Sequence, residues 1–149
     1  MIVELALSDY PAATTFRVDY GETDGQGRVF YANYWRFFDR GRFAYWVQLG
    51  LSEEEIRRLE HDTVIAEVRC SYRAPARFYD AVSVRTRVAR LGRSSLHMDF
   101  VVVNDSTETL MAEGYAILVN VDLGSNRAVA FTPEFKAKIQ ALEGHQLKD

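Results

Sequence analysis

YGETDGQGRVFYANYWRFFDRGRFAYWVQLGL, residues 20–51, joins a glycine-rich loop to a long aromatic segment. The loop carries a carboxylate, Asp24, and the apolar side chains after it recur at helical spacing. These side chains are Tyr34, Phe37, Phe38, Ala44 and Tyr45, with Trp46 and Leu49 on the flank. The pattern predicts a helix over 33–49, with Gly50 just past its end. Gly41 continues the apolar face without a side chain, which predicts a closely packed neighbour.

The position of Asp24 ahead of this helix has a chemical consequence. A glycine loop lets the carboxylate fold back toward the first N–H groups of the helix, where Asn33 is expected to be the N-cap. Those N–H groups carry partial positive charge, so they suit an oxygen that becomes negative during a reaction. The stretch therefore predicts a carboxylate and an oxyanion site close together.

One block of this stretch resembles the signature of the 4-hydroxybenzoyl-CoA thioesterase family of hotdog folds: Asp24-x-x-Gly27-x-Val29-x-Tyr31-x-Asn33-Tyr34. The later strands, the segment 73–77 and the turn 92–95 also follow that family's layout, so the resemblance covers residues 14–135. It implies a hotdog fold, in which an antiparallel sheet wraps a central helix. It also implies dimers that build active sites at the subunit interface and usually pair into tetramers.

Length and composition bound the class of protein. The chain of 149 residues has no linker or repeat, so we expect one domain over 1–149. A net charge of -3 argues against nucleic-acid binding. We expect no membrane insertion, since no apolar run approaches the roughly 18 residues of a membrane span. We also expect no signal peptide. Cys70 is the only cysteine and is expected to be a small buried thiol, which makes the cytoplasm the expected compartment.

The rest of the chain alternates as strands do. Strands are expected at 14–20, 64–72, 81–91, 95–104, 110–122 and 128–131. Ser52 and Glu55 form a capping box for a second helix that ends near residue 60, and Thr132 with Pro133 starts a terminal helix through about 142. Short turns force antiparallel neighbours, and a helix with apolar residues over most of its girth must be wrapped by the sheet. The predicted class is α+β, an antiparallel sheet around one helix.

Such a sheet cannot bury its outer face alone. The side chains predicted to lie opposite the helix-facing set, and hence to meet another subunit, are Val101, Val103, Ala116 and Leu118. A homo-oligomer is therefore expected, and the resemblance implies a dimer of dimers.

Asp24 is the predicted catalytic residue. A thioester carbonyl is attacked either by water that a carboxylate deprotonates or by the carboxylate itself. The resemblance assigns this role to Asp24 and assigns the donor to the carbonyl oxygen to the backbone N–H of Tyr31. From the residues alone, Thr-Asp-Gly favours a turn-forming Asp. Glu22 is the competing carboxylate, ranked as a neighbour, and Asp39 is expected to pair with nearby arginines.

The substrate-binding positions carried over from the motif are Gly27, Val29, Asn33 and Tyr34. For the phosphates of the CoA end we expect the strand-end turn with Arg90, Arg93, Ser94 and Ser95, which the resemblance puts beside the pantetheine and nucleotide entrance. A solvated hairpin turn is the alternative, and Arg73 and Arg77 are second choices. Some branches of the family carry His at position 31. Tyr31 matches the aromatic-acyl branch, which favours an aromatic or bulky acyl group.

Neither a metal nor a cofactor is expected. The three histidines lack metal-ligand spacing, and coenzyme A enters as part of the acyl-CoA substrate. The main prediction is an acyl-CoA thioesterase. Two alternatives stay open: an acyl-thioester hydratase or dehydratase, which typically needs a His near the helix start, and a catalytically silent acyl-CoA binding module.

Overall fold

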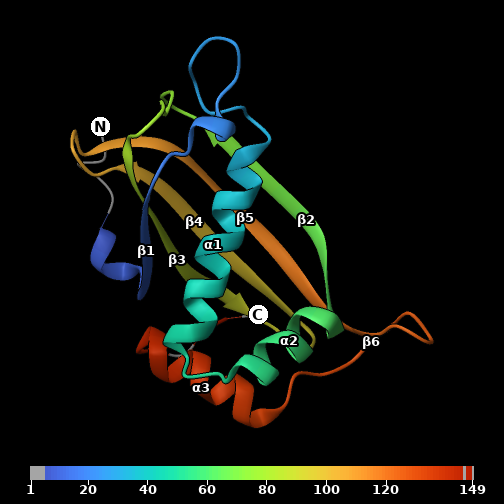
Figure 1. The fold of residues 1–149 in the computed structure, drawn as a ribbon. Coiled ribbons are helices and arrows are strands. Elements are labelled where there is room, and N and C mark those ends of the chain that lie inside the picture. Colours follow the sequence, from blue (N-terminus) through green and yellow to red (C-terminus); the bar gives the residue numbers. More distant parts are fainter. Residues whose placement is uncertain (1–5, 146, 149) are drawn as a thin grey trace.

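In the computed structural model, which describes residues 6–145 and 147–148, one antiparallel sheet curls around helix α1 (Figure 1). The elements in chain order are η1 (Leu7–Asp9), β1 (Ala12–Arg17), η2 (Tyr20–Glu22), α1 (Asn33–Gln48), α2 (Glu53–Asp62), β2 (Thr63–Tyr72), β3 (Ala81–Leu91), β4 (Ser95–Asn104), β5 (Thr109–Asp122), β6 (Arg127–Ala128) and α3 (Pro133–Glu143). The strand order is β1-β3-β4-β5-β2, with β6 beside β5, and neighbours are antiparallel. This is the predicted α+β hotdog architecture.

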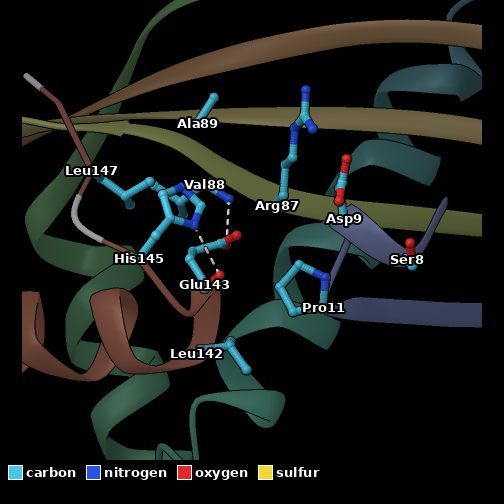
Figure 2. Close-up of a pocket in the computed structure, with 10 residues that line it drawn as sticks. All are labelled: Ser8, Asp9, Pro11, Arg87, Val88, Ala89, Leu142, Glu143, His145 and Leu147. Carbon is cyan, nitrogen blue, oxygen red and sulfur yellow. Dashed lines mark hydrogen bonds between the residues drawn. The ribbon is translucent and has the colours of Figure 1, made fainter. Parts of the chain in front are cut away.

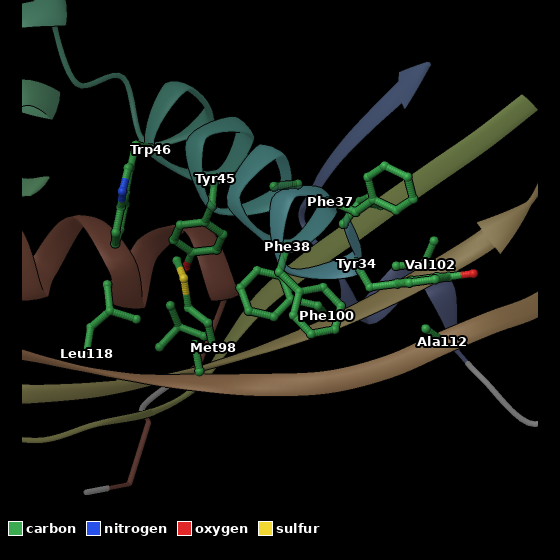
Figure 3. Close-up of a cluster of buried hydrophobic side chains, with 14 of the residues drawn as sticks. Tyr34, Phe37, Phe38, Tyr45, Trp46, Met98, Phe100, Val102, Ala112 and Leu118 are labelled. Carbon is green, nitrogen blue, oxygen red and sulfur yellow. The ribbon is translucent and has the colours of Figure 1, made fainter. Parts of the chain in front are cut away.

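Helix α1 fills the hollow of the sheet with aromatic side chains (Figure 3). The ring of Phe38 in α1 stacks on the ring of Phe100 in β4, with the ring centroids 4.7 Å apart. The predicted close neighbour of Gly41 is present, because a Cβ there would lie 2.5 Å from Oγ1 of Thr86. Gly50 ends the helix as predicted, with a left-handed φ of 84° and an N–H that donates to the carbonyl of Val47.

The first strand starts and ends earlier than its predicted range of 14–20. It ends at Arg17, and Tyr20 lies in η2 with its side chain exposed instead of continuing the buried face of Val18. The physical reason is a tight 3-10 turn that takes the chain out of the sheet: the N–H of Glu22 donates to the Asp19 carbonyl at 3.0 Å, and the N–H of Asp19 donates to the Glu22 carboxylate at 2.8 Å. Strand β6 is shorter than its predicted range, with only Arg127–Ala128 in the ladder.

The expected outer-face set needs a correction. Ala116 and Leu118 face α1, because they pair with Met98 and Leu96 of β4 and cross-strand partners share a face. The prediction that Ala116 and Leu118 contact another subunit was therefore wrong.

Val101 and Val103 are buried on the other face, but the same chain covers them. They cluster with Tyr10 and Leu110, and Leu7 packs against that cluster. Leu7 of η1 and Tyr10 just after it thus cover this part of the outer face within one chain.

Glu60 joins α2 to the central helix. Its carboxylate accepts from Nε and Nη2 of Arg42, at 3.1 and 3.0 Å, and from Nε1 of Trp46 at 2.8 Å. Arg42 also donates to Asp39, so the predicted ion pairing of Asp39 is confirmed. Burial alone lowers the pKa of the Arg42 guanidinium, but Glu60 and Asp39 more than offset it and raise that pKa.

Glu143, at the end of α3, joins this helix to α1 and β3. Its Oε2 accepts from the Tyr45 hydroxyl at 2.6 Å. It also accepts from the Val88 N–H at 2.8 Å, a bond that Figure 2 shows. The β1–β3 ladder stops at Thr86, so the carboxylate serves as partner to a strand edge that β1 does not reach. Burial raises the pKa of the Glu143 carboxyl above its ordinary value.

This raised pKa predicts a pH-dependent stability. Because folding favours the protonated carboxyl, its contribution is present below the ordinary pKa of Glu and is lost as the pH rises through the raised value. Glu143→Gln keeps an acceptor oxygen but cannot ionise. We expect the Tm of the wild type to fall relative to that of Glu143→Gln as the pH rises from about 4 to about 7.

Thermal unfolding over this pH range measures the difference. Glu134→Gln is the matched control, since Glu134 is exposed in the first turn of the same helix and should leave the pH dependence unchanged. A Tm difference between wild type and Glu143→Gln that stays constant with pH would contradict the assignment.

Candidate active site

Asp24 lies in a tight turn between η2 and α1. Its Oδ1 accepts from the backbone N–H groups of Gln26 and Arg28, at 2.7 and 3.3 Å, and its own N–H donates to the Arg28 carbonyl. Gly27 makes the turn possible with a left-handed φ of 77°. Asp24 is therefore the turn-forming residue that its local sequence favours. Its second oxygen, Oδ2, accepts no hydrogen bond from the residues that the structure describes.

The start of α1 folds back onto this loop through Asn33. The predicted N-cap role of Asn33 is wrong, because the N-cap is Ala32 and no side chain caps it. Instead, Nδ2 of Asn33 donates to the Glu22 carbonyl at 2.8 Å, and the N–H of Phe30 donates to the same carbonyl at 2.9 Å. Asn33 thus clamps the two ends of the loop together.

Two backbone N–H groups remain available at this helix start. In the described part of the chain, those of Tyr31 and Ala32 donate no hydrogen bond, while the carbonyl of Phe30 accepts from the Asn33 N–H. Unpaired N–H groups at the first turn of a helix carry its positive end. The turn therefore offers donors to a negatively charged oxygen.

Asp24 and this helix start border the same cleft, whose volume is about 340 Å³. Val29, Tyr31 and Tyr34 of the predicted set also line it, whereas Gly27 and Asn33 shape the loop beside it. Three larger hollows, of about 420, 440 and 470 Å³, lie elsewhere and do not include Asp24. Because this cleft combines the Asp24 carboxylate with the unpaired N–H groups at the start of α1, we take it as the candidate active site.

The cleft also has walls outside the predicted motif: Tyr72 and Arg28 were not predicted, whereas Arg73 was a second choice for the CoA phosphates. Tyr72 and Arg73, at and just after the end of β2, line it together with Arg28. Arg73 pairs with Glu113, at 3.4 Å. Tyr72 and Arg73 reach the cleft because β2 passes the start of α1, and a single sequence gives no signal for that arrangement.

The predicted nucleotide turn lies far from Asp24 within one chain. The Arg93 carbonyl accepts from the N–H of Phe131, which ties the turn to the segment before α3. Helix α3 lies at the opposite end of α1 from the loop that contains Asp24 (Figure 1). The structure therefore does not bring the turn residues together with the cleft: Arg90, Arg93, Ser94 and Ser95.

The histidines and the cysteine lie outside the lining of this cleft. His61 is exposed in α2, His97 stacks on Tyr115 at 4.6 Å between the ring centroids, and His145 follows α3. No group of three or more His, Cys, Asp or Glu side chains in the described residues is placed to hold a metal ion. Cys70 is half-buried, and burial raises the pKa of its thiol to about 11, which disfavours a nucleophilic thiolate.

Within residues 6–145 and 147–148, no helix combines the length and the apolar character that crossing a membrane requires.

Comparison with known proteins agrees with this fold and motif. The profile of the thioesterase-like superfamily matches residues 18–139. The acyl-CoA thioesterase YbgC of Haemophilus influenzae is 29% identical over 129 residues, which cover 85% of this chain and 93% of that protein. The acyl-CoA thioester hydrolase YbgC of Escherichia coli is 29% identical over 106 residues, which cover 71% of this chain and 78% of that protein.

A solved structure gives the same result. The thioesterase of Thermus thermophilus in complex with coenzyme A and zinc superposes with a TM-score of 0.80 at 27% identity, over 93% of this chain and 98% of that one. The family profile spans most of the chain and includes the loop, helix α1 and strands β2 to β6. The chain therefore belongs to the thioesterase-like superfamily.

Proposed function

We propose that the chain hydrolyses an acyl-CoA thioester to a free acid and CoA. The observation that carries the proposal is the cleft in which Asp24 lies beside the unpaired N–H groups at the start of α1. The chain is a thioesterase-type enzyme, as its family and its curated relatives indicate. The reaction breaks the carbon–sulfur bond of the ester and transfers the acyl carbon to an oxygen of water.

The proposed roles follow from the chemistry of that step. Asp24 acts either as the base that deprotonates water or as the nucleophile that forms a mixed anhydride, which water then opens. The N–H of Tyr31 donates to the thioester oxygen as it becomes negative. Removing one such donor typically costs about 2.7–4 kcal/mol of transition-state stabilisation.

The proposed acyl group is aromatic or bulky, as in the 4-hydroxybenzoyl-CoA branch of the family. Three tyrosine rings support this choice, since Tyr31, Tyr34 and Tyr72 line the cleft. Aromatic rings recognise one another through edge-to-face contacts, which contribute about 0.5–1.5 kcal/mol beyond burial.

A second copy of the chain is proposed to complete the site. Strand β2 is an edge of the sheet, and apolar side chains along it are exposed, including Val64, Ile65 and Val68. Antiparallel pairing of β2 with the same strand of a second copy would bring that copy's α3 end toward the Asp24 loop. The turn with Arg90, Arg93, Ser94 and Ser95 would then approach the CoA phosphates from the second subunit.

Two such dimers are proposed to form a dimer of dimers, in the cytoplasm.

Within one chain, Arg28 and Arg73 at the cleft are the alternative phosphate ligands.

The experiment is an assay of free CoA thiol from a panel of aromatic and aliphatic acyl-CoA esters, with a no-substrate blank because Cys70 can react with a thiol reagent. We expect turnover with a preference for aromatic esters. Saturable ester binding without thiol release would favour a silent binding module, and a hydrated or dehydrated ester would favour the hydratase class. Either result would overturn the proposal.

A further inference from the structure

Tyr72 makes a hydrogen bond from the end of β2 to the start of α1. Its hydroxyl donates to the carbonyl of Tyr31 at 3.1 Å, across 41 positions of sequence. The same carbonyl accepts from the N–H of Tyr34, at 3.3 Å. The peptide group between Tyr31 and Ala32 is thus fixed through its oxygen. The N–H of the same peptide group belongs to Ala32 and is one of the two unpaired donors.

The ring of Tyr72 also takes part in the cleft wall. It meets the Tyr34 ring edge-on with centroids 5.2 Å apart, and the Tyr31 ring edge-on at 6.5 Å. The position of the Tyr34 side chain is fixed by a further hydrogen bond, because its hydroxyl accepts from the N–H of Ala76 at 3.3 Å. Tyr72 therefore contacts both the donor turn and the fixed side of the wall, although nearly half of its own surface is exposed.

From these contacts we infer that Tyr72 is a positioning and specificity-determining residue of the acyl-CoA site: its hydroxyl orients the donor turn, and its ring bounds the space for the acyl group. The inference rests on the proposed function. It adds a residue on the sheet edge, outside the motif that carries the family resemblance.

The surroundings of the phenol suit this role. Partial burial, followed by its contact with Cys70, raises the pKa of Tyr72 to about 12. The hydroxyl therefore stays protonated and able to donate throughout the neutral and mildly alkaline range.

Tyr72→Phe and Tyr72→Ala separate the two parts of the inference. Tyr72→Phe keeps the ring and removes one hydrogen bond, so we expect kcat to fall about tenfold with KM within about twofold of wild type. Tyr72→Ala also removes the wall, so we expect the preference for aromatic over aliphatic esters to shrink. Tyr115→Phe is the matched control, since its hydroxyl bonds to Glu67 on the far face of the sheet, and it should leave both quantities unchanged.

A second readout does not need turnover. Hydrogen exchange over residues 30–34 should be faster in Tyr72→Phe than in wild type, because the turn loses its tie to β2. A Tyr72→Phe variant with wild-type kcat, or with unchanged exchange over 30–34, would overturn the inference. If the wild type hydrolyses no ester, the proposed function fails, and the exchange measurement still decides whether Tyr72 holds the turn.

Discussion

Asp24→Asn is expected to lower kcat on acyl-CoA by at least about 100-fold, the scale of lost general acid–base catalysis, and to leave the fold intact. Asn keeps an oxygen that accepts from the N–H groups of Gln26 and Arg28, so the turn persists. It cannot deprotonate water or form an anhydride. The loss should therefore appear in kcat, while KM and the Tm remain close to wild type.

Glu22→Gln is the matched control, because Glu22 is the neighbouring carboxylate that competes for the role. Its side chain is 11% exposed, accepts from the N–H of Asp19 and lies 3.9 Å from Arg40, which are structural contacts. We expect only a modest change in kcat. A fully active Asp24→Asn would remove Asp24 from the mechanism, and an inactive but folded Glu22→Gln would contradict the structural role given to Glu22.

Glu60→Ala is expected to destabilise the protein by about 3 kcal/mol, the cost of leaving one partner of a buried ion pair without its counter-charge. The Arg42 side chain is 7% exposed and would keep only Asp39, while Nε1 of Trp46 would lose its acceptor. The loss of this junction between α1 and α2 should leave the cleft residues in place, so kcat below the unfolding transition should change little.

Urea unfolding of Glu60→Ala measures this cost. Glu53→Ala is the control, because the pair of Glu53 with Arg57 on the same helix is exposed and should contribute little. A double variant, Arg42→Met with Glu60→Ala, should lose less than the sum of the two single changes. A cost for Glu60→Ala no larger than that for Glu53→Ala would contradict the account of this junction.

The elements were predictable where local signals agreed. The aromatic period, Gly50 and the caps at Ser52 and Thr132 predicted all three α-helices. The capping bonds of Ser52 and Thr132 are those expected, whereas Asn33 does not cap α1. Strand faces were less predictable. A bulge between Val102 and Val103 shifts the β4–β5 register, and alternation along one strand does not reveal which face its partner shares.

The site was predictable only as far as it is local in sequence. The motif brought Asp24 and the helix start together, since only the loop separates them. Tyr72 could not be predicted, because its contact to Tyr31 depends on how the sheet curls around α1. The same limit applies to the turn at Arg93, which one chain holds at the opposite end of the helix.

The most direct measurement is the fate of water oxygen during turnover. Wild-type protein is incubated with an aromatic acyl-CoA in water enriched in heavy oxygen, and the acid and CoA are quantified by mass spectrometry. The account predicts equal amounts of CoA and acid, with heavy oxygen in the carboxyl group and almost no product from Asp24→Asn. Intact ester bound to folded wild-type protein, with no labelled acid, would contradict it.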